Sequence, residues 1–256
     1  MLLWASLAGC GSVLPLGCPE ADGNNSLVHR AVGCGASPEV IAKLASEEEA
    51  IAGRDLFDNT PLHLAHNSET VMVLLDSGAD ATAINAYGET VLHLVMRRQT
   101  GFDVSVIDAL IRAGADVNAS DSAGNTPLHE AAQMRKWQVN DRTRHLIRRG
   151  ADLNARNQQG NTPLHLAVLA ARHNEFDLED ATWATATFGL TLVKRYVSDG
   201  MGRSSVNMIM LLQRAGADAE IRNDDGQTAL EMARALHRNS WVMQALTAEM
   251  DGVAGP

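Results

Sequence analysis

The sequence is poor in aromatic residues and has no clusters of positive charge. Its 256 residues include four Phe, two Tyr and four Trp, and 31 acidic residues against 21 Lys and Arg give a formal net charge of −10. No basic run is longer than two residues. Nonspecific nucleic-acid binding depends on clustered Lys and Arg that displace counterions. We therefore expect no nucleic-acid partner.

Long apolar runs and catalytic motifs are also lacking. No stretch reaches the roughly 18 apolar residues that a membrane-spanning helix requires. The chain has no C-x-x-C or H-E-x-x-H motif, no glycine-rich phosphate loop and no nucleophile elbow. Carboxylates such as Glu47 to Glu49 stand in solvated runs. The sequence predicts no enzyme activity, no catalytic residue, no cofactor and no metal site.

A short motif that recurs along the chain is the main positive signal. A T-x-L-H tetrad begins at Thr60, Thr90, Thr126 and Thr162, and a degraded copy begins at Thr228. The separations of 30, 36, 36 and 66 residues indicate a period near 33, with one interval of twice that length. A G-A-D triplet stands at Gly78, Gly114, Gly150 and Gly216. The chain is therefore predicted to be a repeat protein.

Each part of the repeat has a physical explanation. The threonine hydroxyl can cap a helix, and the proline after it has a φ that suits the first helical turn. The glycine of each triplet follows an apolar run, at a place where a helix commonly ends with positive φ. Polar or small residues ending in glycine, such as Asp121 to Gly124, then predict a projecting turn. The predicted unit is two helices and a finger.

This pattern resembles the ankyrin repeat, a unit of about 33 residues that contains T-P-L-H-x-A. The resemblance covers about six units over residues 22–248, with degenerate units at Ser26 to Ala31 and Gly226 to Glu231, as expected of capping repeats. It implies an all-α solenoid of stacked helix-turn-helix units with projecting finger turns. Residues 1–21 form a leader and residues 249–256 a tail in this interpretation.

One predicted unit is longer than the others. From His165 to Gly216 there are 51 residues, whereas His93 to Gly114 and His129 to Gly150 each span 21. We predict an inserted amphipathic helix within residues 173–205, between flanking segments; a degenerate seventh repeat is the alternative.

The leader carries a second motif. Leu7 to Cys10 reads L-A-G-C, which resembles a bacterial lipobox and implies lipidation at Cys10, with a periplasm-facing membrane lipoprotein as the product. The apolar run before it is short and lacks a preceding Lys or Arg, so a leader on a cytoplasmic protein is the alternative. In an oxidising compartment Cys18 and Cys34 form a candidate disulfide; two unpaired thiols are the other possibility.

Five histidines recur in register with the tetrads and invite a metal-site interpretation. We assign them a structural role instead, because copies one repeat apart are too widely spaced to chelate one ion. At the fourth position of the tetrad an imidazole can bond backbone groups of its own turn and of the next finger. They are His29, His63, His93, His129 and His165.

The resemblance implies that partners bind on a concave face built from finger tips and first helices. The tips change from Leu56-Phe57 at one end to Asp224-Asp225 at the other. Aromatic residues and arginines dominate interface hot spots, although the aromatic tips have a second interpretation as local packing over a neighbouring finger. The predicted partner-binding residues are Phe57, Tyr87, Glu89, Arg97, Arg98, Gln133, Met134, Gln158 and Gln159.

Two functions agree with these residues. The first is a monomeric scaffold that binds an unidentified folded protein, with membrane contact only through the lipid anchor. The second is an immunity-type inhibitor that occludes a secreted enzyme, for which the insertion would be the plug.

Overall fold

The computed structural model describes residues 26–45, 48–98, 101–134, 139–171, 204–236 and residue 246. Within these ranges the regular elements are helices, accompanied by two isolated β-bridges, Ile84 to Thr90 and Arg222 to Thr228. The predicted all-α class is confirmed. The chain divides into two compact units, residues 1–122 and 123–256, which are described separately below.

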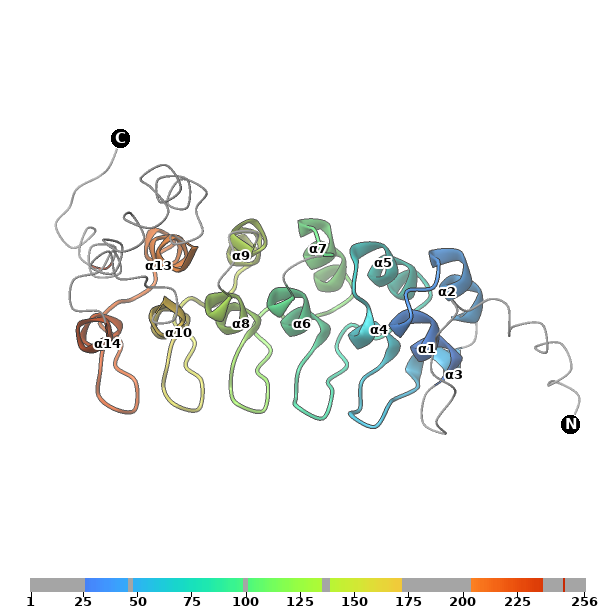
Figure 1. Cartoon of the computed structure of the whole chain (residues 1–256), viewed down its shortest axis with the longest axis horizontal. Coiled ribbons are helices and arrows are strands. Elements are labelled where there is room, and N and C mark those ends of the chain that lie inside the picture. Colours follow the sequence, from blue (N-terminus) through green and yellow to red (C-terminus); the bar gives the residue numbers. More distant parts are fainter. Residues whose placement is uncertain are drawn as a thin grey trace, which may run out of the picture. The chain divides into compact units, whose positions relative to one another are not determined.

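Unit 1 holds three helix pairs. The pairs are α1 (Leu27–Gly33) with α2 (Pro38–Leu44), α4 (Pro61–Leu64) with α5 (Ser68–Asp76), and α6 (Val91–Arg97) with α7 (Val104–Arg112). Helix α4 packs against α1 and α6, and α5 packs against α2 and α7, so first helices stack on first helices and second on second. Figure 1 shows the fingers before α4 and α6 extending on the side away from α5 and α7. A short helix, α3 (Glu48–Ala52), was not predicted and lies in the connection between α2 and α4.

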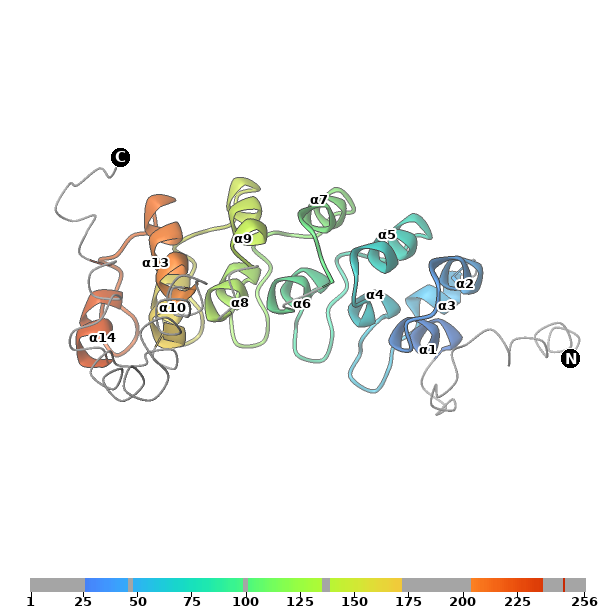
Figure 2. The same ribbon diagram turned by 45° about the horizontal axis from the view of Figure 1, so that its top comes forward.

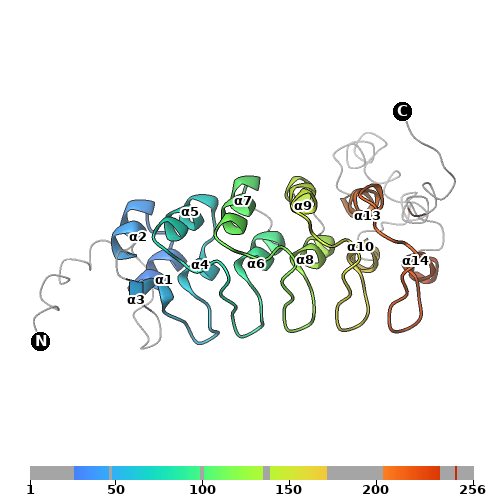
Figure 3. The same ribbon diagram turned by 180° about the vertical axis from the view of Figure 1, so that it is seen from behind.

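Unit 2 repeats this arrangement. Its helices are α8 (Pro127–Gln133), α9 (Val139–Arg148), α10 (Pro163–Ala171), α13 (Ser204–Arg214) and α14 (Ala229–Leu236). Helix α10 packs against α8, α13 and α14, and it lies beside α14 in both Figure 1 and Figure 3. The pair formed by α10 and α13 belongs to the long unit predicted from the sequence. Helix α13 begins at Ser204, one residue before the predicted end of the insertion at residue 205.

The helices of a pair are buried differently. Six consecutive residues of α6, Val91 to Met96, are buried, because this helix is enclosed by its neighbours and by the finger. Helix α7 buries Val106, Ile107, Ala109 and Leu110, which form one stripe at helical spacing. The tilted view of Figure 2 shows α5 and α7 in a layer separate from α4 and α6. The core of unit 1 lies between these two layers.

Finger turns require a residue with positive φ. Gly88, Gly124, Gly160 and Gly226 have φ between 70° and 76° at this position. In the first of the described fingers the same position is Asp58, with φ of 58°. This conformation costs a residue with a Cβ about 1 kcal/mol or more relative to glycine, so the first finger is built with some strain that the others avoid.

Candidate functional site

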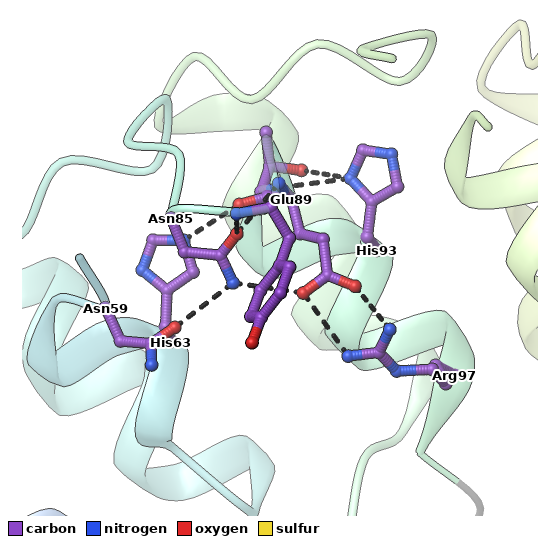
Figure 4. Close-up of polar contacts among 8 residues, drawn as sticks. Asn59, His63, Asn85, Glu89, His93 and Arg97 are labelled. Atoms are coloured by element: carbon purple, nitrogen blue, oxygen red, sulfur yellow. Dashed lines mark hydrogen bonds and ion pairs between the residues drawn. The ribbon is translucent and has the colours of Figure 1, made fainter. Parts of the chain in front are cut away.

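In unit 1 the finger before α6 is held by the buried Asn85. The finger before α4 is held by Asp55, whose Oδ1 accepts from the N–H groups of Phe57 (2.8 Å) and Asn59 (2.9 Å). The Asn85 Oδ1 atom accepts hydrogen bonds from the backbone N–H groups of Tyr87 (2.9 Å) and Glu89 (3.0 Å). Its Nδ2 group donates to Oδ1 of Asn59 in the preceding finger (3.1 Å) and to Oε2 of Glu89 (3.0 Å), as Figure 4 shows. The backbone N–H of Ala86 also donates to the carbonyl oxygen of Phe57 (2.9 Å). The two fingers are therefore fixed to each other below their tips.

The tips of these two fingers carry exposed apolar side chains. Leu56, Phe57, Ile84 and Tyr87, which we call the tip cluster, are 52% to 70% exposed. The rings of Phe57 and Tyr87 are stacked, with centroids 6.4 Å apart and planes inclined by 19°. Each ring thus packs on a neighbouring finger and also faces solvent. Ile84 was not singled out from the sequence, because nothing in its pattern separates it from a finger residue that packs inward.

Two further predicted residues, Glu89 and Arg97, form an ion pair in which the Arg97 guanidinium donates to both Glu89 oxygens. Glu89 is only 6% exposed, whereas the Arg97 side chain is 43% exposed. Burial acts to raise the pKa of Glu89, but hydrogen bonds from Arg97 and Asn85 outweigh it and leave that pKa below its ordinary value. Glu89 therefore lies inside the finger and holds Arg97 at the surface.

Arg98 differs from its neighbour. It is half-buried, and its guanidinium donates to the carbonyl oxygens of Ala65 and His63 near the end of α4. Helix ends leave carbonyl groups without partners in the helix, and Arg98 supplies donors to them from the next repeat. A partner that contacts Arg98, as predicted, therefore has to leave these two hydrogen bonds in place.

The recurring histidines bond backbone groups, as the sequence predicts. The His63 Nδ1 atom accepts from the backbone N–H of Thr60 (3.2 Å), so the ring proton is assigned to Nε2, which donates to the carbonyl oxygen of Glu89 (3.1 Å). His129 and His165 repeat this geometry toward Asn161 and Gln227. Burial lowers the pKa of His63 and His165 and keeps them neutral. The described ranges contain no group of three or more potential metal ligands.

The remaining predicted residues belong to unit 2. Gln133, Gln158 and Gln159 are exposed and Met134 is half-buried. The finger backbone matches that of unit 1, because Gln158 N–H donates to the Ala123 carbonyl (3.0 Å) and Asp224 N–H to that of Gln159 (3.1 Å). The predicted residues are thus distributed over two separately described units.

Several predictions lie outside the described residues. These are the leader with Cys10 and Cys18, the inserted helix, and the tail. Cys34 is disulfide-bonded, and its partner is not among the described residues, where Cys34 is the only cysteine; its pairing with Cys18 stays a prediction. In the part of the chain that is described, no helix is long and apolar enough to span a membrane.

Comparison with known proteins agrees with this architecture. A family model described as ankyrin repeats matches the chain in three copies, over residues 66–156 and 92–178. No curated protein matches the chain.

Proposed function

Because the chain belongs to the ankyrin-repeat family, whose members are generally protein–protein interaction modules, we propose that it is a scaffold that binds a folded protein partner through the tip cluster and Arg97 of unit 1. The observation that carries this proposal is the stacked, exposed pair of Phe57 and Tyr87. Stacked aromatic side chains give a large contact area, and they lose little conformational freedom on binding because the stack already orders them.

The supporting framework favours binding over a purely structural role for these rings. Asn85, the backbone bond from Ala86 to Phe57 and the Glu89–Arg97 pair hold the fingers below the tips. The rings are thus positioned without being buried. A surface of preorganised aromatic and arginine side chains is typical of interface hot spots.

Affinity purification with paired baits tests this function. The wild-type chain is compared with the double variant Phe57→Ala/Tyr87→Ala. Gln158→Ala/Gln159→Ala in unit 2 serves as the matched control, because these two residues belong to the sequence-based prediction but lie outside the surface proposed here. We expect a protein that the wild type and the control retain and the double variant loses. If every retained protein also binds the double variant, the tip cluster is not the binding surface.

We also propose that the protein acts in the bacterial envelope, tethered through Cys10, because L-A-G precedes that residue and Cys34 is disulfide-bonded, which is typical of oxidising compartments. Replacing Cys10 by Ser is expected to move the protein from the membrane fraction to the soluble fraction. Unchanged fractionation contradicts the tether.

None of the described residues favours the inhibitor alternative, which depends on the insertion. Deleting residues 175–203 separates the two functions, because a scaffold keeps its affinity for the partner without the insertion, whereas an inhibitor loses its inhibition.

A further inference from the structure

Three of the described fingers carry an arginine at the same position. In each, the guanidinium donates to the carbonyl oxygen of the residue four positions further on: Arg54 to Asp58, Arg156 to Gly160 and Arg222 to Gly226. This bond closes the finger loop. The three arginines therefore make the same hydrogen bond to the backbone of their own finger, so they can be compared by their other partners.

Their charges are balanced differently. In unit 2, Arg156 forms an ion pair with Asp224 (2.9 Å), and Arg222 forms one with Glu231 (2.7 Å). In unit 1, exposed Arg54 donates to two backbone carbonyl oxygens, those of Asp58 (2.9 Å) and Ile84 (2.6 Å), and makes no ion pair with a carboxylate of the described ranges. The positive charge of Arg54, next to the tip cluster, is thus not balanced by a carboxylate of the described ranges.

The missing carboxylate has a simple cause. Gln159 lies three residues after Arg156, and its carbonyl oxygen accepts from the N–H of the tip residue Asp224. The residue in the same place relative to Arg54 is Ala86, whose N–H donates to Phe57. Alanine offers no acceptor. The Arg54 charge does reach Asp80, but the low pKa of Asp80 comes first from its hydrogen bonds with Thr82 and only to a lesser extent from Arg54.

We propose that the partner supplies this carboxylate: it presents an Asp or Glu beside an apolar side chain, so that the carboxylate binds Arg54 as Asp224 binds Arg156 while the apolar group covers the tip cluster. This inference rests on the proposed function and deepens it. A charge-assisted hydrogen bond at the edge of an apolar contact gives specificity for partners that present an acidic residue beside an apolar side chain. It disfavours partners with a basic residue at that place.

The test uses a displayed library of a small folded helical domain with a randomised surface as the probe. Clones are selected on the wild-type chain, and those that also bind Phe57→Ala/Tyr87→Ala are removed. Asp and Glu are expected to be enriched over the input library in the remaining clones. Arg54→Gln should weaken these clones about tenfold, which corresponds to 1.4 kcal/mol. The matched variant Arg156→Gln should leave them within about twofold.

A second variant supplies the carboxylate within the chain. Ala86→Asp places an acid where Asp224 stands relative to Arg156, and it should weaken the selected clones at least about tenfold, whereas the isosteric Ala86→Asn should have much less effect. An increase of about 1 to 3 °C in Tm for Ala86→Asp, absent in the Arg54→Gln background, reports the pair itself.

The possible failures are distinguishable. Tip-dependent clones without acidic enrichment, or clones indifferent to Arg54→Gln, overturn the inference and leave the proposed function standing. If the library yields no clone that depends on Phe57 and Tyr87, the tip cluster is not a binding surface, and the proposed function and the inference both fail.

Discussion

The fingers of unit 1 and unit 2 share one backbone but carry different tips. Ala86 N–H donates to Phe57 in unit 1 as Asp224 N–H donates to Gln159 in unit 2. Asn85 donates to Asn59 as Asn157 donates to Asn125. Above this framework, unit 1 presents stacked aromatic rings, whereas unit 2 presents amides and an arginine–aspartate pair.

The comparison separates structure from recognition. Buried asparagine, histidine and backbone groups fix the finger in both units, so the tip side chains are free to vary without loss of the fold. In unit 2 the tip residue Asp224 is paired with Arg156 of the same chain, and in unit 1 the apolar tips are exposed. We therefore propose a recognition surface in unit 1 alone, which is narrower than the sequence-based prediction that also included Gln133, Met134, Gln158 and Gln159 of unit 2.

Removing the buried asparagine should have the largest effect on stability. Asn85→Ala and Asn157→Ala each remove a buried side chain that makes at least three hydrogen bonds, so we expect each to lower the free energy of unfolding by about 3 kcal/mol. Urea denaturation monitored by circular dichroism measures this. A loss in one unit only would break the claim that both units use the same framework; Gln159→Ala, at an exposed tip, is the control.

The Glu89–Arg97 pair should have an intermediate, pH-dependent effect. Glu89→Gln is expected to cost about 1.5 kcal/mol at pH 7, because a buried charge-assisted bond is lost. The pKa of Glu89 is lower in the folded state, so its contribution is present above the unfolded pKa of about 4.3 and disappears as pH falls through the folded value. The difference between wild type and Glu89→Gln should therefore shrink below about pH 4.3.

The corresponding control lies in unit 2. The pair of Arg222 with Glu231 is exposed, and Glu231→Gln should cost less than Glu89→Gln at pH 7 because solvent screens it. Equal losses, or a loss for Glu89→Gln that does not change with pH, would contradict the account of the buried pair.

A smaller loss is expected at the helix caps. Thr126 is the N-cap residue of α8, and its hydroxyl bonds the His129 ring at 2.9 Å. Thr126→Ala should lower the free energy of unfolding by about 1 kcal/mol. Thr228→Ala should cost less, because Ala229 and Glu231 stand there in place of the proline and histidine of the tetrad, so no bond between a hydroxyl and an imidazole is lost. Thermal unfolding measures both, and equal losses would contradict this difference between the two caps.

The smallest effect should be a gain. Asp58 occupies the positive-φ position that the other described fingers fill with glycine, so Asp58→Gly should raise stability by about 0.5 kcal/mol, the relief of strain being partly offset by a more flexible unfolded chain. Gly88→Asp is the reciprocal variant and should destabilise, because a Cβ there would lie 2.8 Å from the Ser122 backbone nitrogen. A loss of stability in Asp58→Gly would show that the aspartate is favoured there for its own contacts.

Most of the fold could be predicted from the sequence. The tetrads and the G-A-D glycines mark helix starts and ends through local backbone requirements, and local requirements are readable in a sequence. Helix α3 was missed because the acidic run Glu47 to Glu49 was interpreted as solvated chain, although Gly53 directly follows the helix. Asp58 was missed as a positive-φ residue because the finger pattern is recognised by its glycine.

The candidate site was less predictable, because it depends on contacts between repeats. Phe57 and Tyr87 are 30 residues apart, and only the stacked fold brings their rings together. Adjacent Arg97 and Arg98 look equivalent in the sequence, yet the first pairs with Glu89 at the surface and the second donates to backbone carbonyls of α4. Which charge remains open to a partner, as at Arg54, depends on residues of the neighbouring finger.

The most direct test of the recognition surface is the affinity of a partner recovered by the paired baits, measured by calorimetry for Phe57→Ala, Tyr87→Ala and Gln159→Ala. We predict that each aromatic variant weakens binding by about 2 kcal/mol, roughly 30-fold, and lowers the free energy of unfolding by no more than about 1 kcal/mol for the lost stack. Gln159→Ala should leave both within about twofold and 0.5 kcal/mol. Equal affinity for all variants, or aromatic variants that lose binding only as far as they lose folded protein, would contradict the account.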